Sequence, residues 1–202
     1  LNLSASPFAQ QHTEERRQIV QANAARYNTP VFYANHVGAQ TELIFDGGSL
    51  VSNSRGVIVD EQNFFEPSIA YYEWSDIEAQ TVSKVNPIHN MELIRQALVT
   101  GIRDYFAKLG LKQAILGLSG GIDSALVTAL ATQALGKENV LAVLMPSEYS
   151  SDHSISDSIE LVNKLGINHQ IIPITPVYHA LLEQLKPSFG NLPFSVAEEN
   201  LQ

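Results

Sequence analysis

The sequence predicts an α/β fold that holds parts of two domains, and three observations carry this prediction. Residues 113–174 alternate short apolar runs with amphipathic stretches, which is typical of parallel β-α-β units. Residues 1–60 combine one helical stretch with several strand patterns, which also favours α/β layering. Residues 63–87 mix aromatic residues, acids and prolines without a sustained period. We therefore expect a first domain, with its linker, over residues 1–84 and a second over residues 85–202.

The first domain is predicted to open with a strand, a helix and further strands. Residues 1–6 are short and apolar and stand before Pro7, as in a strand. After Thr13 the sequence has two acids and then apolar residues at helical spacing, which predict a helix that opens near Thr13. Pro30 ends any helical continuation. Strand patterns separated by turn residues follow at 31–37, 41–48, 49–51 and 56–60.

The second domain is predicted to begin with a long helix and to continue as a parallel sheet. Apolar residues recur every three or four positions over residues 91–109, with Asn90 as a predicted N-cap and Gly110 as a stop. We expect this helix to pack against the sheet. The strands are predicted at 113–118, 139–146 and 168–174, and the helices between them at 124–136 and 154–166. Parallel sheets of this kind bind ligands at the carboxyl ends of their strands.

Composition excludes several classes of function. A net charge of -9 and a pI near 5.0 argue against nucleic acid as a partner, because phosphate backbones require clustered Lys and Arg. The chain has no cysteine, so disulfides, thiolate metal sites and a cysteine nucleophile are excluded within it. The sequence lacks both an apolar run long enough to span a membrane and a signal-like start, so we expect a cytoplasmic protein.

The most informative stretch is "SGGIDS", residues 119–124, where the first parallel strand meets its helix. Gly120 and Gly121 permit positive φ and leave room for a ligand beside the backbone. Free N–H groups and the helix dipole attract an anion such as phosphate at this point. Ser119 and Ser124 add hydroxyl donors, and Asp123 offers a hard oxygen suited to Mg²⁺. The stretch therefore predicts a pyrophosphate-binding loop with a metal ligand.

A simpler interpretation is a tight turn capped by Ser119 or Asp123, but capping alone needs one polar residue and one glycine. The loop is not a Walker A motif, because no lysine follows the glycines, and it does not fit the G-x-G-x-x-G pattern. Its five fixed positions are expected by chance in roughly 10⁻⁴ of chains of this length.

"SGGIDS" resembles the signature of the N-type ATP pyrophosphatases. Residues 116–136 and 140–167 are similar to the synthetase domain of glutamine-dependent NAD⁺ synthetases, and "LNLSASPF", "NHVGAQTELIFDGGSL" and "RGVIVD" resemble their glutaminase domain. The resemblance implies the C-terminal part of a nitrilase-like α/β sandwich (carbon–nitrogen hydrolase), followed by the N-terminal part of a parallel-sheet, Rossmann-like domain of the adenine nucleotide alpha-hydrolase type.

The resemblance also implies a reaction and a set of ligands. The family amidates deamido-NAD⁺ to NAD⁺ through an adenylated intermediate, with ATP and Mg²⁺ and with ammonia taken from glutamine. Asp123 would bind Mg²⁺, and Asn200 in "AEENLQ" would contact deamido-NAD⁺, although Glu198 and Glu199 beside it also fit a solvated helix start. The residues implied in ATP binding are Gly117, Leu118, Ser119, Gly120, Gly121, Ile122, Asp123, Ser124, Leu144 and Met145.

In the glutaminase part, the positions that match the family's glutamine-binding residues are Ser6 and His12. His12 departs from the usual Lys or Arg, and a histidine changes charge near neutral pH; an ordinary loop histidine is the alternative. Asp46, before two glycines, either orients a loop near the amidase pocket or belongs to a D-G-G turn. The family's catalytic Glu, Lys and Cys lie upstream of the matching region, so we expect an internal fragment that is inactive alone.

Two alternatives remain open at this point. The chain could belong to another N-type ATP pyrophosphatase that adenylates a different substrate, or it could be a noncatalytic nucleotide-binding module. The remaining histidines show no ligand spacing with carboxylates and are predicted to be structural; they are His36, His89, His153, His169 and His179. By resemblance we also expect a homo-oligomer.

Overall fold

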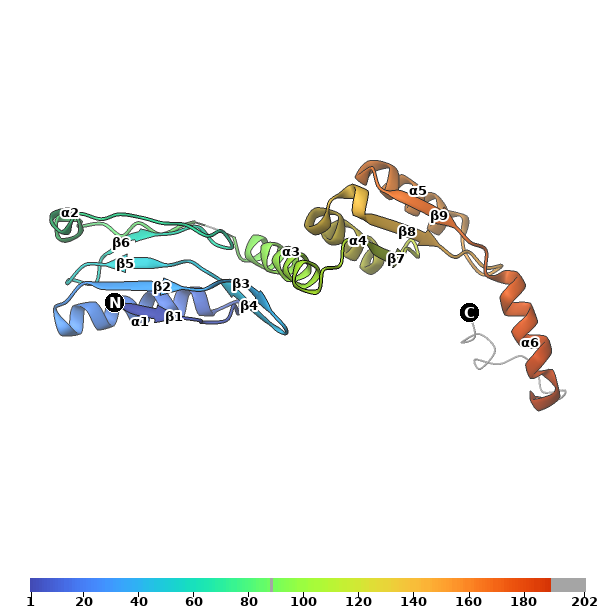
Figure 1. Cartoon of the computed structure of the whole chain (residues 1–202), viewed down its shortest axis with the longest axis horizontal. Coiled ribbons are helices and arrows are strands. Elements are labelled where there is room, and N and C mark those ends of the chain that lie inside the picture. Colours follow the sequence, from blue (N-terminus) through green and yellow to red (C-terminus); the bar gives the residue numbers. More distant parts are fainter. Residues whose placement is uncertain (88, 190–202) are drawn as a thin grey trace. The chain divides into compact units, whose positions relative to one another are not determined.

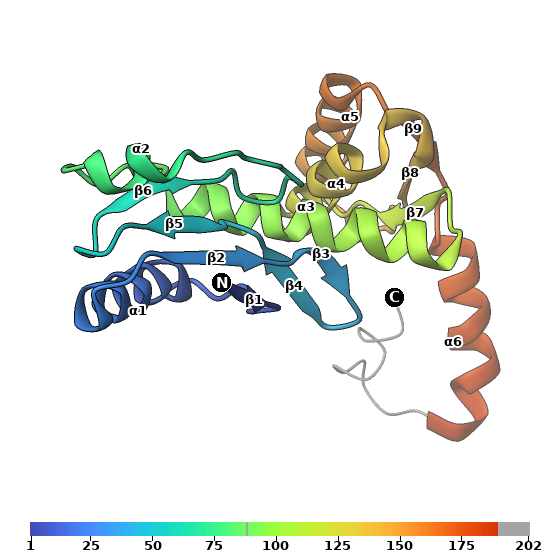
Figure 2. The same ribbon diagram turned by 60° about the vertical axis from the view of Figure 1, so that its left-hand side comes forward.

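The computed structural model describes residues 1–87 and 89–189 and confirms the α/β fold. Contacts divide the chain into two compact units, Leu1–Leu111 and Lys112–Gln202. The predicted domain boundary between residues 84 and 85 rests on the irregular sequence pattern of residues 63–87, and it stays a prediction. The elements of both units are labelled in Figure 1, and a second view is given in Figure 2.

Unit 1 is built on a mixed sheet in the order β1-β2-β5-β6. Strand β1 pairs with β2 in parallel, whereas β2–β5 and β5–β6 are antiparallel. The predicted strand at residues 31–37 is interrupted at His36, after which β3 forms a separate antiparallel pair with β4. The strands are β1 (Asn2–Ser4), β2 (Val31–Asn35), β3 (Val37–Gln40), β4 (Leu43–Asp46), β5 (Leu50–Ser52) and β6 (Ile58–Glu61).

Each face of this sheet buries alternate residues against a different segment. On one face, Val20 of helix α1 (His12–Tyr27) packs with Tyr33 and Leu50. On the opposite face, Val51, which follows Leu50 in β5, packs with Ile77 of the short helix α2 (Trp74–Ala79). This alternation follows from the period of two residues in a β-strand.

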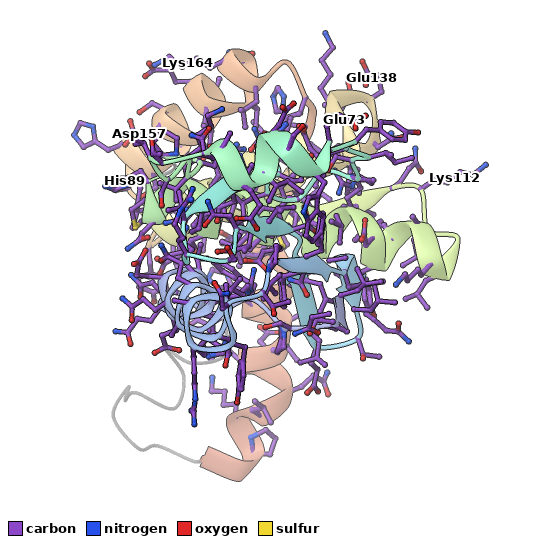
Figure 3. The ribbon with its side chains drawn as sticks, turned by 90° about the vertical axis from the view of Figure 1, so that its left-hand side faces the viewer. Glu73, His89, Lys112, Glu138, Asp157 and Lys164 are labelled. Carbon is purple, nitrogen blue, oxygen red and sulfur yellow. The ribbon has the colours of Figure 1, made fainter. Side chains whose placement is uncertain are left out.

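Helix α3 (Asn90–Leu109) differs from the prediction in its packing and its N-cap. We expected it to cover the parallel sheet, but it belongs to unit 1, where it packs on β3 and β4 and joins a buried cluster through Leu93 and Ala97. The N-cap is His89 rather than Asn90, and its Nδ1 accepts a hydrogen bond of 3.2 Å from the Met91 N–H (His89 is labelled in Figure 3). Gly110 ends the helix at φ 68°, as predicted.

Unit 2 contains the parallel sheet that the sequence predicts, in the order β7-β8-β9. Alternate residues of the central strand are buried under α4 and α5, namely Val140, Ala142 and Leu144. A further helix, α6 (Thr175–Phe189), was not predicted. The other elements are β7 (Ala114–Gly117), α4 (Ile122–Leu135), η1 (Lys137–Asn139), β8 (Val140–Leu144), α5 (Asp152–Leu165) and β9 (Asn168–Ile171).

Candidate functional site

The loop of residues 119–124 lies at the carboxyl end of β7 and opens helix α4, as predicted. Gly120 has φ +81°, and a Cβ there would lie 2.5 Å from the backbone oxygen of Ser154 on α5. Gly121 is extended instead, with φ −81° and ψ 155°, and a Cβ there would lie 3.5 Å from Ser119 Oγ. Only Gly120 therefore uses the positive φ that we expected of both glycines.

The two serines of the loop hydrogen-bond within it. The Ser119 and Ser124 hydroxyl oxygens lie 3.1 Å apart, and Ser124 Oγ also accepts from the Ser119 N–H at 3.2 Å. The Ser124 hydroxyl donates to the Gly121 carbonyl oxygen at 2.9 Å. These bonds connect the end of β7 to the first turn of α4, so the loop has a defined shape.

The first turn of α4 fits an anion accompanied by a cation. The N-cap Gly121 has no side chain that could accept the first N–H groups of the helix, so these donors are available to a ligand. Asp123 is exposed in the same turn. Mg²⁺ is commonly held by one or two carboxylates together with substrate phosphates and water, and a single Asp123 suits that mode. Within the described residues, no group of three or more His, Asp or Glu could hold a metal by itself.

A cavity of about 330 Å³ opens at the carboxyl ends of β7 and β8. Of the ten residues predicted to bind ATP, five line it: Gly117, Leu118, Ser119, Leu144 and Met145. Pro146, which follows Met145, also lines it, and the lining residues that were not predicted are Ser150, Ser154, Ile155 and Ser158. Of these residues, Ser154 and Ser158 lie on α5, and their spacing of four residues was the available signal, because positions i and i+4 share one helix face.

A second hollow, of about 270 Å³, also adjoins the loop. Gly120 lines it together with Asp157 and Lys164, which α5 carries (Figure 3). Lys164 also pairs with Glu160 at 2.6 Å, one helical turn away. Leu118 and Ser158 line both hollows, whereas Gly120 lines only the second, charged one.

In unit 1, the predicted glutamine-binding residues Ser6 and His12 line a common cavity of about 430 Å³. Arg16 and Tyr33, which the sequence analysis did not select, line it as well. His12 Nδ1 lies 3.2 Å from the Pro7 carbonyl oxygen. The structure thus brings Ser6 and His12 together, and their role in binding glutamine stays a prediction.

Asp46 takes part in a buried ion pair beside this cavity. Its carboxylate is fully buried and accepts from both terminal nitrogens of Arg16, at 3.0 and 3.3 Å. The guanidinium also donates to the Gly47 carbonyl oxygen at 3.1 Å. Gly47 and Gly48 have φ of 70° and 58°, values that favour glycine, and they connect β4 to β5 directly after Asp46.

Two other observations bear on the sequence predictions. Asn200, predicted to contact deamido-NAD⁺, lies outside the described residues. Among the helices that the structure describes, none combines the length and the apolar character needed to cross a membrane.

Comparison with known proteins decides the family. The NAD synthase family pattern matches residues 94–202, which is more than half of the chain. The chain belongs to the NAD synthase family. The match contains all of unit 2, so the loop of residues 119–124 and the cavity beside it lie within the NAD synthase region.

Individual members of the NAD synthase family extend the similarity across unit 1. The chain is 46% identical to a glutamine-dependent NAD(+) synthetase from Synechocystis and 39% identical to one from Thermotoga maritima, in both cases over 100% of this chain. It covers 37% and 41% of those proteins, so it spans about two fifths of the length of these curated relatives.

Solved structures of two glutamine-dependent NAD+ synthetases match the fold of this chain. A glutamine-dependent NAD+ synthetase from Acinetobacter baumannii, in complex with ADP, matches 100% of this chain with a TM-score of 0.90 at 34% identity, and 39% of that chain is covered. A second, from Cytophaga hutchinsonii, gives a TM-score of 0.82 at 18% identity, which supports the fold alone; 99% of this chain and 41% of that one are covered.

Proposed function

We propose that the protein containing this chain amidates deamido-NAD⁺ to NAD⁺, using ATP and ammonia released from glutamine. The observation that carries the proposal is the loop of residues 119–124, with its side-chain-free N-cap Gly121 and exposed Asp123, beside a cavity at the strand ends. Family membership and relatives named glutamine-dependent NAD(+) synthetase support the choice of substrates. In this proposal residues 1–84 are the end of the glutaminase domain and residues 85–202 the start of the synthetase domain.

The reaction proceeds in two balanced steps. The nicotinate carboxylate of deamido-NAD⁺ attacks the α-phosphorus of ATP, and the bond to the β-phosphate breaks to release pyrophosphate. Ammonia then attacks the acyl carbon, the bond to AMP breaks, and the amide of NAD⁺ forms with loss of a proton. The N–H groups at the start of α4 stabilise the pyrophosphate as its charge develops. Mg²⁺ held by Asp123 would neutralise part of that charge.

The remaining assignments belong to the same proposal. The adenosine of ATP lies in the cavity beside Leu144 and Met145, glutamine binds at Ser6 and His12, and deamido-NAD⁺ reaches Asn200. The ADP complex of the Acinetobacter baumannii relative supports an adenine nucleotide as ligand. Because the reaction consumes ATP, we assign it to the cytoplasm. A homo-oligomeric state stays a prediction.

The test measures NAD⁺ formed from deamido-NAD⁺, ATP and Mg²⁺ by the full-length enzyme, with glutamine or with ammonium as the nitrogen source. We expect product with both. Asp123→Ala should lower both rates by about 10²-fold, because a metal ion supplies several kcal/mol of charge stabilisation. Glu138→Ala is the matched control, since Glu138 is exposed in η1, beyond the far end of α4.

Three results would contradict the proposal in different ways. Turnover of xanthosine monophosphate or aspartate without turnover of deamido-NAD⁺ would identify another N-type ATP pyrophosphatase. Nucleotide binding without any product would identify a binding module. Product with ammonium alone would refute the glutamine-dependent part only.

A further inference from the structure

The segment from Ser6 to His12 joins β1 to α1, and a partly buried hydrogen-bond network holds its first residue. The Ser6 N–H donates to Asn35 Oδ1 at 2.9 Å, and Asn35 Nδ2 donates to the Ser6 carbonyl oxygen at 3.3 Å. A single amide side chain therefore binds both backbone polar groups of Ser6. The backbone pairing of β1 with β2 ends at Ser4 and Asn35, so the Asn35 side chain continues it by two residues.

Asn35 is itself held in a fixed orientation. Its Nδ2 also donates to Asp46 Oδ1 at 3.2 Å and to the Gly47 carbonyl oxygen at 2.9 Å. The same Asp46 oxygen accepts from Arg16 Nη2 at 3.0 Å. Nδ2 has two N–H donors, which the three acceptors share, and Oδ1 faces an N–H donor. The reverse orientation would turn Oδ1 toward three acceptors, so the amide has one favoured orientation.

Burying the Arg16–Asp46 ion pair costs desolvation free energy, which suggests that the pair has a role other than stabilising the fold. The Arg16 side chain is 7% exposed and that of Asp46 is 0% exposed. Replacing such a buried ion pair by apolar residues of similar volume is often neutral or stabilising by about 1–4 kcal/mol. A buried ionic network is therefore a weak source of stability. Arg16 Nε finds no hydrogen-bond partner among the described residues, but the two terminal nitrogens of Arg16 fix the Asp46 carboxylate.

We infer that Asn35 is a positioning residue for glutamine, which it serves by fixing Ser6 at the wall of the cavity that Ser6 shares with His12. The Arg16–Asp46 pair fixes Asn35 in turn. This inference rests on the proposed function, since it takes glutamine as the ligand of that cavity. Asn35 reaches the substrate only through Ser6, so it acts on binding geometry rather than on the reacting atoms.

The test is Asn35→Ala in the full-length enzyme, with the Michaelis parameters measured separately for glutamine and for ammonium. We expect the KM for glutamine to rise at least ~10-fold, because a displacement of about 1 Å in a positioned group can cost up to about 10²-fold. The kcat with saturating glutamine should fall much less. Ammonium-supported NAD⁺ formation should change less than about twofold, since ammonium bypasses the glutamine site.

Asn53→Ala is the matched control. Asn53 is another asparagine of unit 1, fully buried where Asn35 is half-buried. Its side chain also binds backbone groups, accepting from the Arg55 and Val57 N–H groups at 3.1 and 3.0 Å and donating to the Gln80 carbonyl oxygen at 2.8 Å. It does not line the Ser6 and His12 cavity. We expect this variant to lose thermal stability without a rise in the KM for glutamine.

The outcomes separate the inference from the function on which it rests. An unmodified enzyme that uses ammonium but not glutamine would refute both. An unmodified enzyme that uses glutamine, together with an Asn35→Ala variant whose KM for glutamine is unchanged, would refute the positioning role alone. An equal rise in KM in both asparagine variants would also refute it, because general destabilisation would then explain the effect.

Discussion

Gly120→Ala is the sharpest test of how the anion-binding loop is built. A Cβ at this position would lie 2.5 Å from the Ser154 carbonyl oxygen, 2.6 Å from its Cα and 2.8 Å from its Cβ. These atoms belong to helix α5 and cannot rotate away. The left-handed backbone costs an alanine about 1–2 kcal/mol, and overpacking adds about 1–3 kcal/mol. We therefore expect unit 2 to lose about 2–5 kcal/mol of unfolding free energy.

Hydrogen exchange measures this loss within unit 2 alone, because the slowest amides of β8 report the free energy of opening of their own cooperative unit. The expected loss corresponds to a fall in protection of about 30-fold to several thousand-fold, since 1.4 kcal/mol is a factor of ten. Gly121→Ala is the control, because its φ of −81° suits alanine and a new Cβ would make only an ordinary contact of 3.5 Å with Ser119. Equal protection in the two variants would refute the close approach of the loop to α5.

Two further predictions concern unit 1. The Glu61 carboxylate is 1% exposed and pairs with Arg17 at 2.6 Å. Arg17→Met leaves this carboxylate without its cation, so thermal unfolding should show a loss of about 3–5 kcal/mol of unfolding free energy. A second change, Glu61→Met, should recover part of that loss. Burial, and next the hydrogen bond of 2.7 Å to Asp60, raises the pKa of Tyr72 above its ordinary value of 10.0. Because the folded state keeps the phenol protonated, this stabilisation is present below about pH 10 and is lost as the pH rises further. Asp60→Asn should lower the pKa of Tyr72 in a titration followed by tyrosinate absorbance, and an unchanged curve would contradict the assignment.

The parallel sheet of unit 2 was predictable because its signals are local. Each strand is a short apolar run, and each helix starts and stops at residues that favour those positions, such as Ser151 as N-cap of α5 and Gly166 as its C-cap. The same reasoning located the loop of residues 119–124 between a strand and a helix. It did not separate the two glycines: Gly120, which packs against Ser154 more than 30 residues away, has the positive φ, and Gly121 has the extended backbone that is usual for an N-cap residue.

The errors arose where distant residues decide the structure. The amphipathic face of α3 indicates burial but not the partner, and the partner is the β3–β4 pair rather than the parallel sheet. The Arg16–Asp46 pair joins residues 30 positions apart, and neither residue carries a local sign of burial. At the strand break, the His36 N–H donates to the Ser4 carbonyl oxygen and its carbonyl oxygen accepts from the Gly47 N–H, and the residue pattern indicates neither partner. The N-cap was misplaced by one residue for a local reason, because His89 Nδ1 accepts from the Met91 N–H.

The internal bonds of the loop affect how a ligand binds there. The contact of Gly120 with α5 and the bonds between Ser119 and Ser124 order this backbone during folding. Ordering a residue costs about 1–2 kcal/mol of conformational entropy. This backbone loses that entropy when the chain folds, before a ligand binds. A nucleotide then associates with a preorganised backbone, and its binding heat capacity reflects the surface it covers rather than the folding of a segment.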